Sequence, residues 1–438
     1  MVILLRNFKN IFLIPELLKK LLFTLGVIVV FRIGSFIPVV GINVPLLASF
    51  MDRAGAAGGL LGYLDVISGG SLQRCTLFAL GIGPYISSSI IMQLMSMTVP
   101  YFERMIKEGD YGYKLLNQYT RYLTFALSVM YSLTYATFLE RAGLVLNPGM
   151  SFRIVFVLSL TLGSMFVMWL GEQISMMGVG NGSSMLIFSG IVAHFPDYFI
   201  KTYVAVENGN MHLFVALFVL LFFMAVTACI VFLEKGDRKI PVQYARRVVG
   251  RKVYGGQSTY IPFKINTAGV MPAIFAQSIL QVPLFLLQML AGRFLIAKTM
   301  LEHFTYTGFL FNLFQFALIV FFTFFYTELV YNPDKLSDQM KKNGGFIPGI
   351  RPGKSTADYF YYILTRVGLV GALYLGMLSI MPNVLLMIVP GLPFYIGGTS
   401  LLIVVGVALE FASQVESYLI ERNYKGFLTT GQMKNRIA

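Results

Sequence analysis

The stretches of sequence that decide the fold are Gly81-Ile82-Gly83-Pro84-Tyr85-Ile86 and Gly269-Val270-Met271-Pro272-Ala273-Ile274. The two share glycine, proline and isoleucine at matching positions, and the likeness continues to Gln93 and Gln281. The offset between matched residues is constant at 188 (269 minus 81). An internal repeat is the first feature to test in a long chain, and this one predicts two related halves. The alternative is that two Gly-x-x-Pro patterns coincide in a glycine-rich chain.

The composition is that of a membrane protein. Of 438 residues, 56% are hydrophobic and only 12% are charged. A soluble protein of this length does not combine so much apolar side chain with so little charge. A helix needs about 20 apolar residues to cross a bilayer, which predicts an all-α polytopic fold. The ten expected spans are 21–41, 76–97, 119–139, 154–172, 184–204, 213–233, 267–291, 307–331, 363–382 and 395–415.

The basic residues predict the orientation in the membrane. With the N-terminus in the cytoplasm, 26 of the 34 lysines and arginines fall in cytoplasmic segments. Positive charge is retained on that side during insertion. We therefore expect a multi-pass membrane protein with both termini cytoplasmic. The first span carries Arg32 and Pro38 and does not read as a cleavable signal peptide.

The repeated segments fall in spans two and seven, which are an odd number of spans apart and so run in opposite directions. This predicts two inverted halves around a central path. The expected N-terminal half is 1–205 and the expected external hinge is 206–212. The C-terminal half is 213–438, with long cytoplasmic loops at 234–266 and 332–362 and a cytoplasmic tail at 416–438.

A short apolar segment at about 59–70, with glycine pairs at both ends, lies between spans one and two. It is too short to cross a bilayer, and irregular backbone at membrane depth needs protein or a water-filled cavity around it. We expect a mobile re-entrant segment there. An interfacial helix on the outer surface explains the composition equally well.

Isoleucines recur at helical spacing in the spans. Ile82 and Ile86 share one helix face, as do Ile187 and Ile191, and Ile274 occupies the position of Ile86 in the repeat. Such stripes are ordinarily packing. If these faces converge on an axis, they form an apolar constriction that excludes ions by dewetting.

The chain offers no set of residues for catalysis. His194, His212 and His303 stand alone, so no metal or cofactor is expected. The stretch 348–356 imitates a phosphate-binding loop but has proline in place of the first glycine. Charges within spans are Arg32, Glu328 and Glu410, of which only Arg32 lies near mid-membrane and is a functional candidate. An ion-coupled transporter would need paired carboxylates, so that class is disfavoured; a membrane anchor for a cytoplasmic complex is the other rival.

Two cytoplasmic loops are densely basic. Their charges suit phosphate backbones, anionic lipid or an acidic protein surface. Retention of positive loops during insertion explains the charge but not the length, which favours a docking platform. The residues expected to dock a partner are Arg246, Arg247, Arg251, Lys252, Arg351 and Lys354.

Longer motifs support a resemblance along nearly the whole chain. They are Leu80–Ile86 with Met92-Gln93-Leu94, Gly171–Ile174 with Gly178–Ser183, Gly255–Thr259, Gly344–Gly353, and Pro393–Tyr395 with Gly397–Ile403. In these residues the chain resembles the SecY/Sec61-alpha family of channel-forming translocon subunits.

The resemblance implies an hourglass channel for unfolded polypeptide in a bacterial inner membrane, without catalysis of its own. The implied partners are SecE-like and SecG-like small membrane subunits, a ribosome or the SecA motor ATPase as driving partner, secretory and membrane-protein precursors, and lipid. Met271 stands where the family often has isoleucine, so its place beside the pore is open. The implied pore ring is Ile82, Ile86, Ile187, Ile191, Ile274 and Ile403; the implied plug residues are Leu60, Leu61, Leu64, Val66 and Ile67; the implied lateral gate, built from spans two, three, seven and eight, includes Ser87, Ser88, Gln93, Ala276, Gln277 and Gln281.

Overall fold

The computed structural model describes residues 14–47, 49–50, 68–209, 211–244, 247–249, 252–254, 258–291, 299–300, 308–388 and 398–434. These residues are largely helical, as predicted. The helices of the first half are α2 (Pro15–Gly34), α5 (Gly83–Thr98), α6 (Pro100–Lys107), α7 (Asp110–Arg141), α8 (Met150–Met177), α9 (Gly182–Val192) and α10 (Phe195–Glu207).

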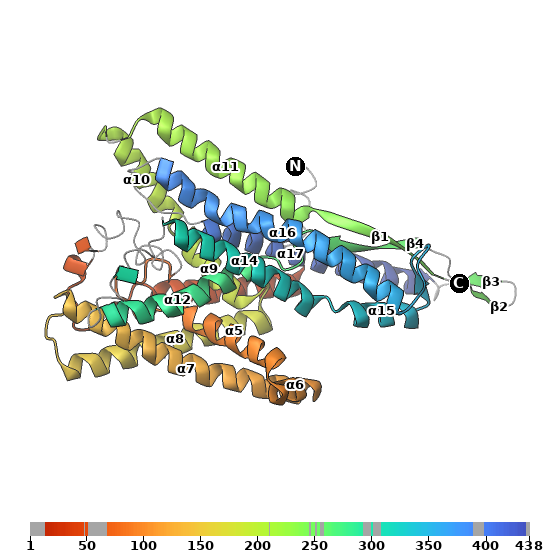
Figure 1. The fold of residues 1–438 in the computed structure, drawn as a ribbon, viewed down its shortest axis with the longest axis horizontal. Coiled ribbons are helices and arrows are strands. Elements are labelled where there is room, and N and C mark those ends of the chain that lie inside the picture. Colours follow the sequence, from red (N-terminus) through yellow and green to blue (C-terminus); the bar gives the residue numbers. More distant parts are fainter. Residues whose placement is uncertain are drawn as a thin grey trace.

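The second half contains helices and the strands of the described residues (Figure 1). Its elements are α11 (Leu213–Lys235), β1 (Asp237–Tyr244), β2 (Arg247–Val249), β3 (Lys252–Tyr254), β4 (Ser258–Lys264), α12 (Met271–Ala291), α14 (Phe309–Val330), α15 (Pro333–Lys342), β5 (Gly345–Phe346), α16 (Lys354–Ile388) and α17 (Gly398–Lys434).

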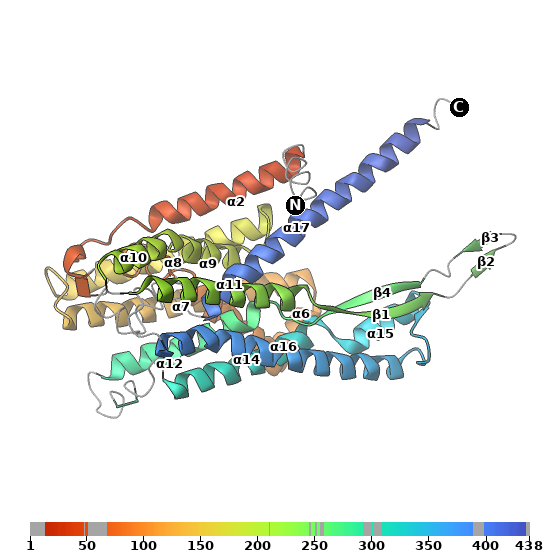
Figure 2. The same ribbon diagram turned by 90° about the horizontal axis from the view of Figure 1, so that it is seen from above.

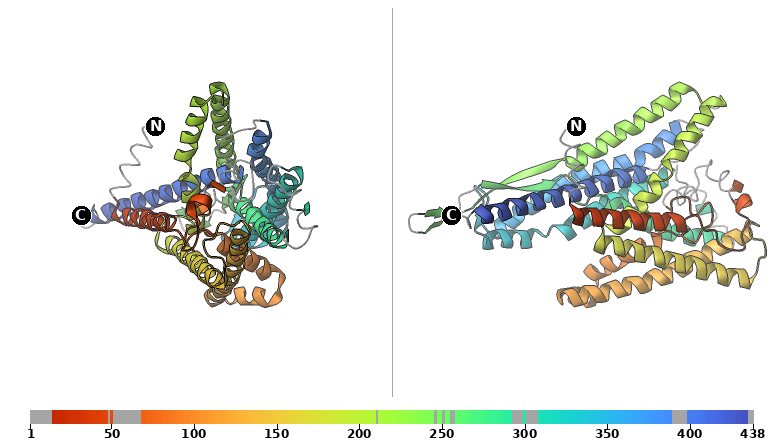
Figure 3. Two further views of the ribbon diagram at one scale, coloured as in Figure 1. Left: turned by 90° about the vertical axis from the view of Figure 1, so that its left-hand side faces the viewer. Right: turned by 180° about the vertical axis from the view of Figure 1, so that it is seen from behind.

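Each of the ten expected spans contains a helix of the described residues. Among those residues, α7, α8, α11, α14, α16 and α17 are each long and apolar enough to cross a membrane. The chain is therefore a multi-pass helical membrane protein. Figure 3 shows the helices gathered side by side when the bundle is viewed along its length.

Three boundaries differ from the expected ones. Helix α2 ends at Gly34, before the expected end at 41, and the chain beyond it is extended, with Val39 N–H donating to Cys75 O at 3.0 Å. Residues 76–82, expected to start span two, form turns instead of helix. Span five is two helices, because the chain breaks at Ala193-His194 and Pro196 opens α10.

The two copies of the repeat share one backbone conformation. Gly81 and Gly269 both lie in the left-handed region, with φ of 55° and 61°, which glycine adopts without steric cost. Helix α5 begins two residues after Gly81 and α12 two residues after Gly269. Proline follows as the second helical residue in both, where its missing N–H costs nothing. The repeat in sequence is thus a repeat in structure.

The two basic loops form one body at one end of the molecule, here called the hairpin end. Strands β1 and β4 pair antiparallel from Asp237↔Lys264 to Gln243↔Ser258. Strand β5 of the other loop pairs with β1 through Gln243↔Phe346 and Tyr244↔Gly345, giving the order β4-β1-β5. Figure 1 shows β2 and β3 projecting farthest at this end.

Side chains from both loops bury a small core beneath this sheet. Ile240, Val242 and Phe263 of the sheet pack with residues of α15 and α16 such as Met340 and Phe360. The expected loop 332–362 is therefore mostly ordered structure. Likewise the expected tail from residue 416 continues α17 as far as Lys434, and Figure 2 shows this helix leaving the bundle.

The halves run in opposite senses relative to the hairpin end. Helix α5 leads into α6, which lies at this end, whereas α12 follows β4 and starts nearest it (Figure 1). The halves meet where α12 packs against α5 and α7, and again where α17 packs against α9. Residues of both halves share the largest buried apolar cluster, which lies between these contacts.

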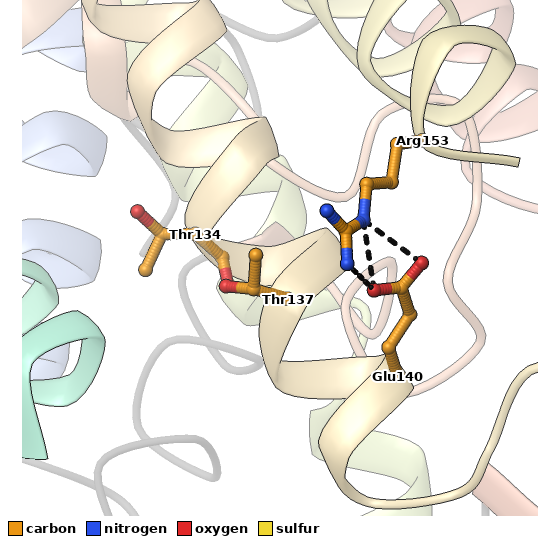
Figure 4. Close-up of polar contacts among 4 residues, drawn as sticks. All are labelled: Thr134, Thr137, Glu140 and Arg153. Atoms are coloured by element: carbon orange, nitrogen blue, oxygen red, sulfur yellow. Dashed lines mark hydrogen bonds and ion pairs between the residues drawn. The ribbon is translucent and has the colours of Figure 1, made fainter. Parts of the chain in front are cut away.

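Polar side chains join neighbouring helices within each half. In the first half, Ser128 Oγ donates to Ser164 Oγ at 3.1 Å, and Ser132 Oγ lies 3.3 Å from Thr161 Oγ1, linking α7 to α8. At the end of α7 remote from the hairpin, Arg153 Nε donates to Glu140 Oε2 at 2.8 Å (Figure 4).

The second half has the corresponding links between α14 and α16. Gln315 Nε2 donates to Ser379 Oγ at 2.9 Å, and Asn383 Nδ2 donates to Asn312 Oδ1 at 2.6 Å. All four side chains are buried. Hydrogen bonds between helices hold helix pairs together where no water competes for the polar groups. Each half therefore contains a helix pair joined by hydrogen bonds between side chains, α7–α8 in the first and α14–α16 in the second.

Candidate functional site: an isoleucine cluster between the halves

The six isoleucines singled out from the sequence lie in one buried cluster. Ile82 precedes α5, Ile86 lies on α5, and the others come from α9, α12 and α17. None is more than 7% exposed. The side chains therefore face the meeting of the two halves rather than the outer surface. The members are Ile82, Ile86, Ile187, Ile191, Ile274 and Ile403.

The repeat identifies one further apolar residue that the sequence interpretation missed. Val270 holds the position of Ile82 in the second copy, is 7% exposed and belongs to the same cluster. Met271 is only partly buried and packs against the cluster. The constant offset of the repeat was the signal that could have found Val270, because Ile86 and Ile274 already align by it.

Helix α9 is positioned by the glycine-rich turn before it. Asn181 caps the helix, since its Oδ1 accepts from Ser183 N–H at 3.1 Å. A Cβ on Gly182 would lie 1.8 Å from Gly171 O, so only glycine allows this approach of α9 to α8. Gly180 N–H donates to Gln414 Oε1 of α17 at 2.8 Å. The turn thereby places Ile187 and Ile191 against α17 and its Ile403.

The residues expected at a lateral gate lie where α12 meets α5 and α7, and this region is here called the gate face. Ser87, Ser88, Ala276 and Gln277 are buried, and Gln93 is half-buried. Gln281 lies on α12, but its side chain is outside the described residues. The expected residues from α5 and α12 are thus on helices in contact.

Gln277 has an unpaired side-chain amide at the gate face. It is 3% exposed, yet neither its Nε2 nor its Oε1 has a hydrogen-bond partner among the described residues. Oε1 of Gln93 on α5 also lacks a partner there, whereas Ser88 Oγ donates to Pro84 O at 2.7 Å. A buried amide without partners costs about 1–3 kcal/mol, so both α5 and α12 bury polar atoms at an energetic cost.

The expected plug residues Leu60, Leu61, Leu64, Val66 and Ile67 lie outside the described residues. The chain immediately after them is held at mid-bundle. Arg32 Nη1 donates to Gly69 O at 3.0 Å. A Cβ on Gly69 would lie 2.9 Å from Gly190 Cα of α9, so the two backbones touch. Arg32, the expected mid-membrane charge, therefore anchors the end of the glycine-flanked segment.

The expected docking residues lie at the hairpin end. Arg247 and Lys252 are on β2 and β3, while Arg246 and Arg251 fall outside the described residues. Arg351 and Lys354 are exposed. Thr356 Oγ1 donates to Arg351 O at 2.8 Å, and Ser337 Oγ donates to Gly353 O at 2.7 Å, which hold this loop against α15.

The described part of the chain contains no candidate metal site. No group of three His, Cys, Asp or Glu side chains there could hold a metal ion. Cys75 is buried, Cys229 is exposed, and both are free.

Comparison with known proteins agrees with this geometry. The family model SecY matches residues 76–412. The protein translocase subunit SecY of Escherichia coli K12 is 44% identical over 428 residues, covering 96% of this chain and 95% of that protein. The SecY of Aquifex aeolicus is 41% identical over 427 residues, covering 96% and 98%.

Solved structures share the fold at low sequence identity. A structure described as a protein conducting channel matches with a TM-score of 0.64 and 18% identity over 91% of this chain and 92% of that one. Sec61 in the canine ribosome-channel complex matches with a TM-score of 0.60 and 17% identity, again over 91% and 92%.

Inverted helical halves that meet around a buried apolar cluster define a polytopic membrane protein of the inverted-repeat class, which also includes many transporters. Within that class, the matched family model and the near-full-length relatives show the particular family. This chain belongs to the SecY family.

Proposed function

We propose that this chain is the pore-forming subunit of a protein-conducting channel. It passes unfolded secretory polypeptides across the membrane and releases apolar helices sideways into lipid. The observation that carries the proposal is the single buried cluster that gathers all six isoleucines from both halves. These residues form the pore ring. Relatives that match over nearly their full length are translocase subunits, and the chain itself performs no catalysis.

An apolar ring suits a channel that must pass many different sequences. Specific polar contacts would retain some segments and reject others, whereas aliphatic side chains yield to any segment. In the absence of substrate, a narrow apolar constriction excludes ions because water leaves it. Val270 adds to this ring in the second half as Ile82 does in the first.

The gate face provides the sideways exit. Helices α5 and α12 start from equivalent turns and meet across the two halves, so their separation opens the ring toward lipid. The unpaired amide of Gln277 is buried at this contact at an energetic cost. A passing segment of about 20 apolar residues gains about 1.5–3 kcal/mol for each large aliphatic side chain that it buries, which drives it into lipid.

The segment around residues 59–70 is the plug in this proposal, with Leu60, Leu61, Leu64, Val66 and Ile67 as its apolar residues. One matched structure carries the description that the plug domain of SecY stabilises the closed state and maintains a membrane seal. In this chain, the Arg32–Gly69 bond fixes the end of the segment and supports the same role.

The hairpin end is the docking platform for the driving partner and faces the cytoplasm. Arg247 on β2 and Lys252 on β3, together with their sequence neighbours Arg246 and Arg251, suit ribosomal RNA, and exposed Arg351 and Lys354 suit a ribosome or a SecA motor. Two matched structures are channels bound to ribosomes. SecE-like and SecG-like subunits complete the complex. Both chain ends lie on the cytoplasmic side of a bacterial inner membrane.

Crosslinking of a stalled secretory chain tests the pore directly. A cysteine at Ile86, which is 7% exposed, should crosslink to the stalled chain, whereas a cysteine at Leu158, which is 57% exposed on α8, should not. Equal crosslinking at both positions, or none at position 86, contradicts the proposal. A transporter would instead show saturable uptake of a small solute, and an anchor would never contact the passing chain.

A further inference from the structure

Strands β1 and β4 with the chain between them form a hairpin, residues 237–264. Only six residues, Ile265–Val270, join this hairpin to the gate helix α12. Strand β4 ends at Lys264 and α12 begins at Met271, so no other element lies between them. The hairpin carries the proposed docking charges at its tip, and α12 forms one side of the gate face. Strand β1 has eight residues and spans about 26 Å at 3.3 Å per residue. Because the connection is short, a tilt of the hairpin should displace residues 265–270 and with them the start of α12.

Two bonds hold the root of the hairpin. Ile265 N–H donates to Gly236 O at 2.9 Å, closing the two legs where they leave the bundle. Beside it, Asn266 Nδ2 donates to Glu234 Oε2 of α11 at 2.8 Å. Asn266 is only 2% exposed. A hydrogen bond to a charged acceptor of this kind contributes more than a neutral one.

The same amide group reaches the start of α12. Asn266 Nδ2 also donates to Gly269 O at 3.0 Å, and Gly269 is the left-handed residue that sets up α12. One NH₂ group thus binds a carboxylate at the hairpin root and a carbonyl at the gate helix. The Gly269 carbonyl can only accept a hydrogen bond, so the amide nitrogen must face it, which settles the orientation of the side chain.

Residues 265–270 also contact α14 and α16, but these contacts differ from the Asn266 hydrogen bonds. A Cβ on Gly371 of α16 would lie 2.6 Å from Ile265 O, so α16 touches the connection on another side. Thr267 Oγ1 lies 2.9 Å from Thr327 Oγ1 of α14. Neither of these contacts reaches the hairpin legs. Among the described residues, the Asn266 amide is the side-chain group bonded both to Glu234 beside the hairpin root and to the turn before α12.

We propose that Asn266 is a positioning residue that couples the hairpin to the first turn of α12, so that a partner docking on the hairpin shifts the gate helix. The inference rests on the proposed function, because it takes the hairpin as the docking site and α12 as part of the gate. It adds the residue through which the two communicate. Glu234 is its fixed point at the end of α11.

The test separates docking from the response of the gate. The full chain, purified with its small subunits in lipid nanodiscs, carries a polarity-sensitive fluorophore on a cysteine at Ile279 of α12, with Cys75→Ala and Cys229→Ser as background. Ribosomes are added, and binding is measured by sedimentation while the emission shift reports α12. Asn266→Asp keeps the side-chain volume but replaces the NH₂ group by a carboxyl oxygen, which cannot donate to both Glu234 Oε2 and Gly269 O.

We expect Asn266→Asp to bind ribosomes within about two-fold of the parent chain while the emission shift falls at least two-fold. Glu234→Gln should keep most of the shift, because its Oε1 still accepts from Asn266. Thr327→Val is the matched control: it removes the neighbouring hydroxyl contact and should leave the shift intact. If Asn266→Asp does not fold, Asn266→Ser, whose hydroxyl is too short to reach Glu234, replaces it.

Three results would overturn the coupling. They are a full shift in Asn266→Asp and Asn266→Ser, an equal loss in Thr327→Val, or a loss that follows reduced ribosome binding. Failure of the proposed function looks different, because the parent chain itself would then bind no ribosomes or give no shift. The two ideas are therefore tested by separate arms of one experiment.

Discussion

The two copies of the repeated turn begin their helices in the same way but are supported by different chemistry. The chain before α5 is held by rings: Phe78 stacks on Phe31 and on Phe166, each at 5.9 Å between centroids. The chain before α12 is held by the carboxylate–amide contact of Glu234 and Asn266. The local Gly-x-x-Pro sequence is thus sufficient to start the helix, while its support is free to vary.

The two supports involve different helices. The aromatic support joins α2 and α8, and Gly34 of α2 lets the Phe78 ring approach so closely that a Cβ would lie 2.0 Å from it. The polar support lies at the root of the hairpin. Ring packing joins the chain before α5 to α2 and α8, whereas the Asn266 hydrogen bonds join the start of α12 to the end of α11 beside the hairpin root. We infer a fixed gate helix in the first half and a responsive one in the second.

Truncation of the aromatic support should give the largest effect. Phe78 is 2% exposed, so Phe78→Ala leaves a cavity and should lower the unfolding free energy by about 3–5 kcal/mol. The unfolding midpoint of the purified complex in detergent measures this. Phe166→Ala is the control: this ring is 40% exposed in the same stack and should cost clearly less. Equal losses would show that the stack is not centred on Phe78.

Loss of the Arg32 bond should come next. Arg32→Met leaves Gly69 O without its charged donor and should cost about 1.5–3 kcal/mol. Because residue 69 ends the proposed plug, the resting channel should also conduct more ions in planar bilayers. Arg32→Lys retains the charge and should leak less than Arg32→Met. Resting conductance equal to that of the parent chain in Arg32→Met would remove Arg32 from the seal.

Truncation of the polar support should cost less than that of the aromatic one. Asn266→Ala removes both hydrogen bonds of the amide nitrogen, one of them to a carboxyl group, and should lower the unfolding free energy by about 1.5–3 kcal/mol. The same unfolding midpoint measures it. If Asn266→Ala proves as damaging as Phe78→Ala, the two supports are equally rigid and the contrast between fixed and responsive gate helices is wrong.

The smallest effects should come from the bonds within each helix pair. Hydrogen bonds between membrane helices contribute about 0.6 kcal/mol on average and up to about 1.7. Asn383→Ala breaks the 2.6 Å bond to Asn312, and Ser128→Ala breaks the 3.1 Å bond to Ser164. We expect the amide pair to lose more than the hydroxyl pair. Ser417→Ala, on an exposed part of α17, should change nothing measurable.

The sequence was sufficient to predict the helical class, the repeat and the buried isoleucines. These features depend on local periodicity and on glycine and proline at turns, which a single chain displays directly. The repeat also aligns Val270 with Ile82. The structural meaning of this match became clear only because α5 and α12 begin at matching positions of the two copies.

Other features depend on contacts between distant residues and had no local signal. The pairing of β5 with β1 joins two loops about a hundred residues apart in sequence. The break of span five at Ala193-His194 lies within an apolar run that periodicity treats as one helix. Asn266 reads as an ordinary loop asparagine until its amide is placed between Glu234 and Gly269.

The shared three-stranded sheet has a consequence for how partners can act. Because β5 is bonded to β1, force applied to the Arg351 loop and force applied to the hairpin tip converge on one strand. Two large partners, each bound to a different loop, would therefore both displace strand β1. We expect such partners to bind this channel alternately. A longer hairpin tip would lengthen the lever arm but would leave the connection between β4 and α12 unchanged.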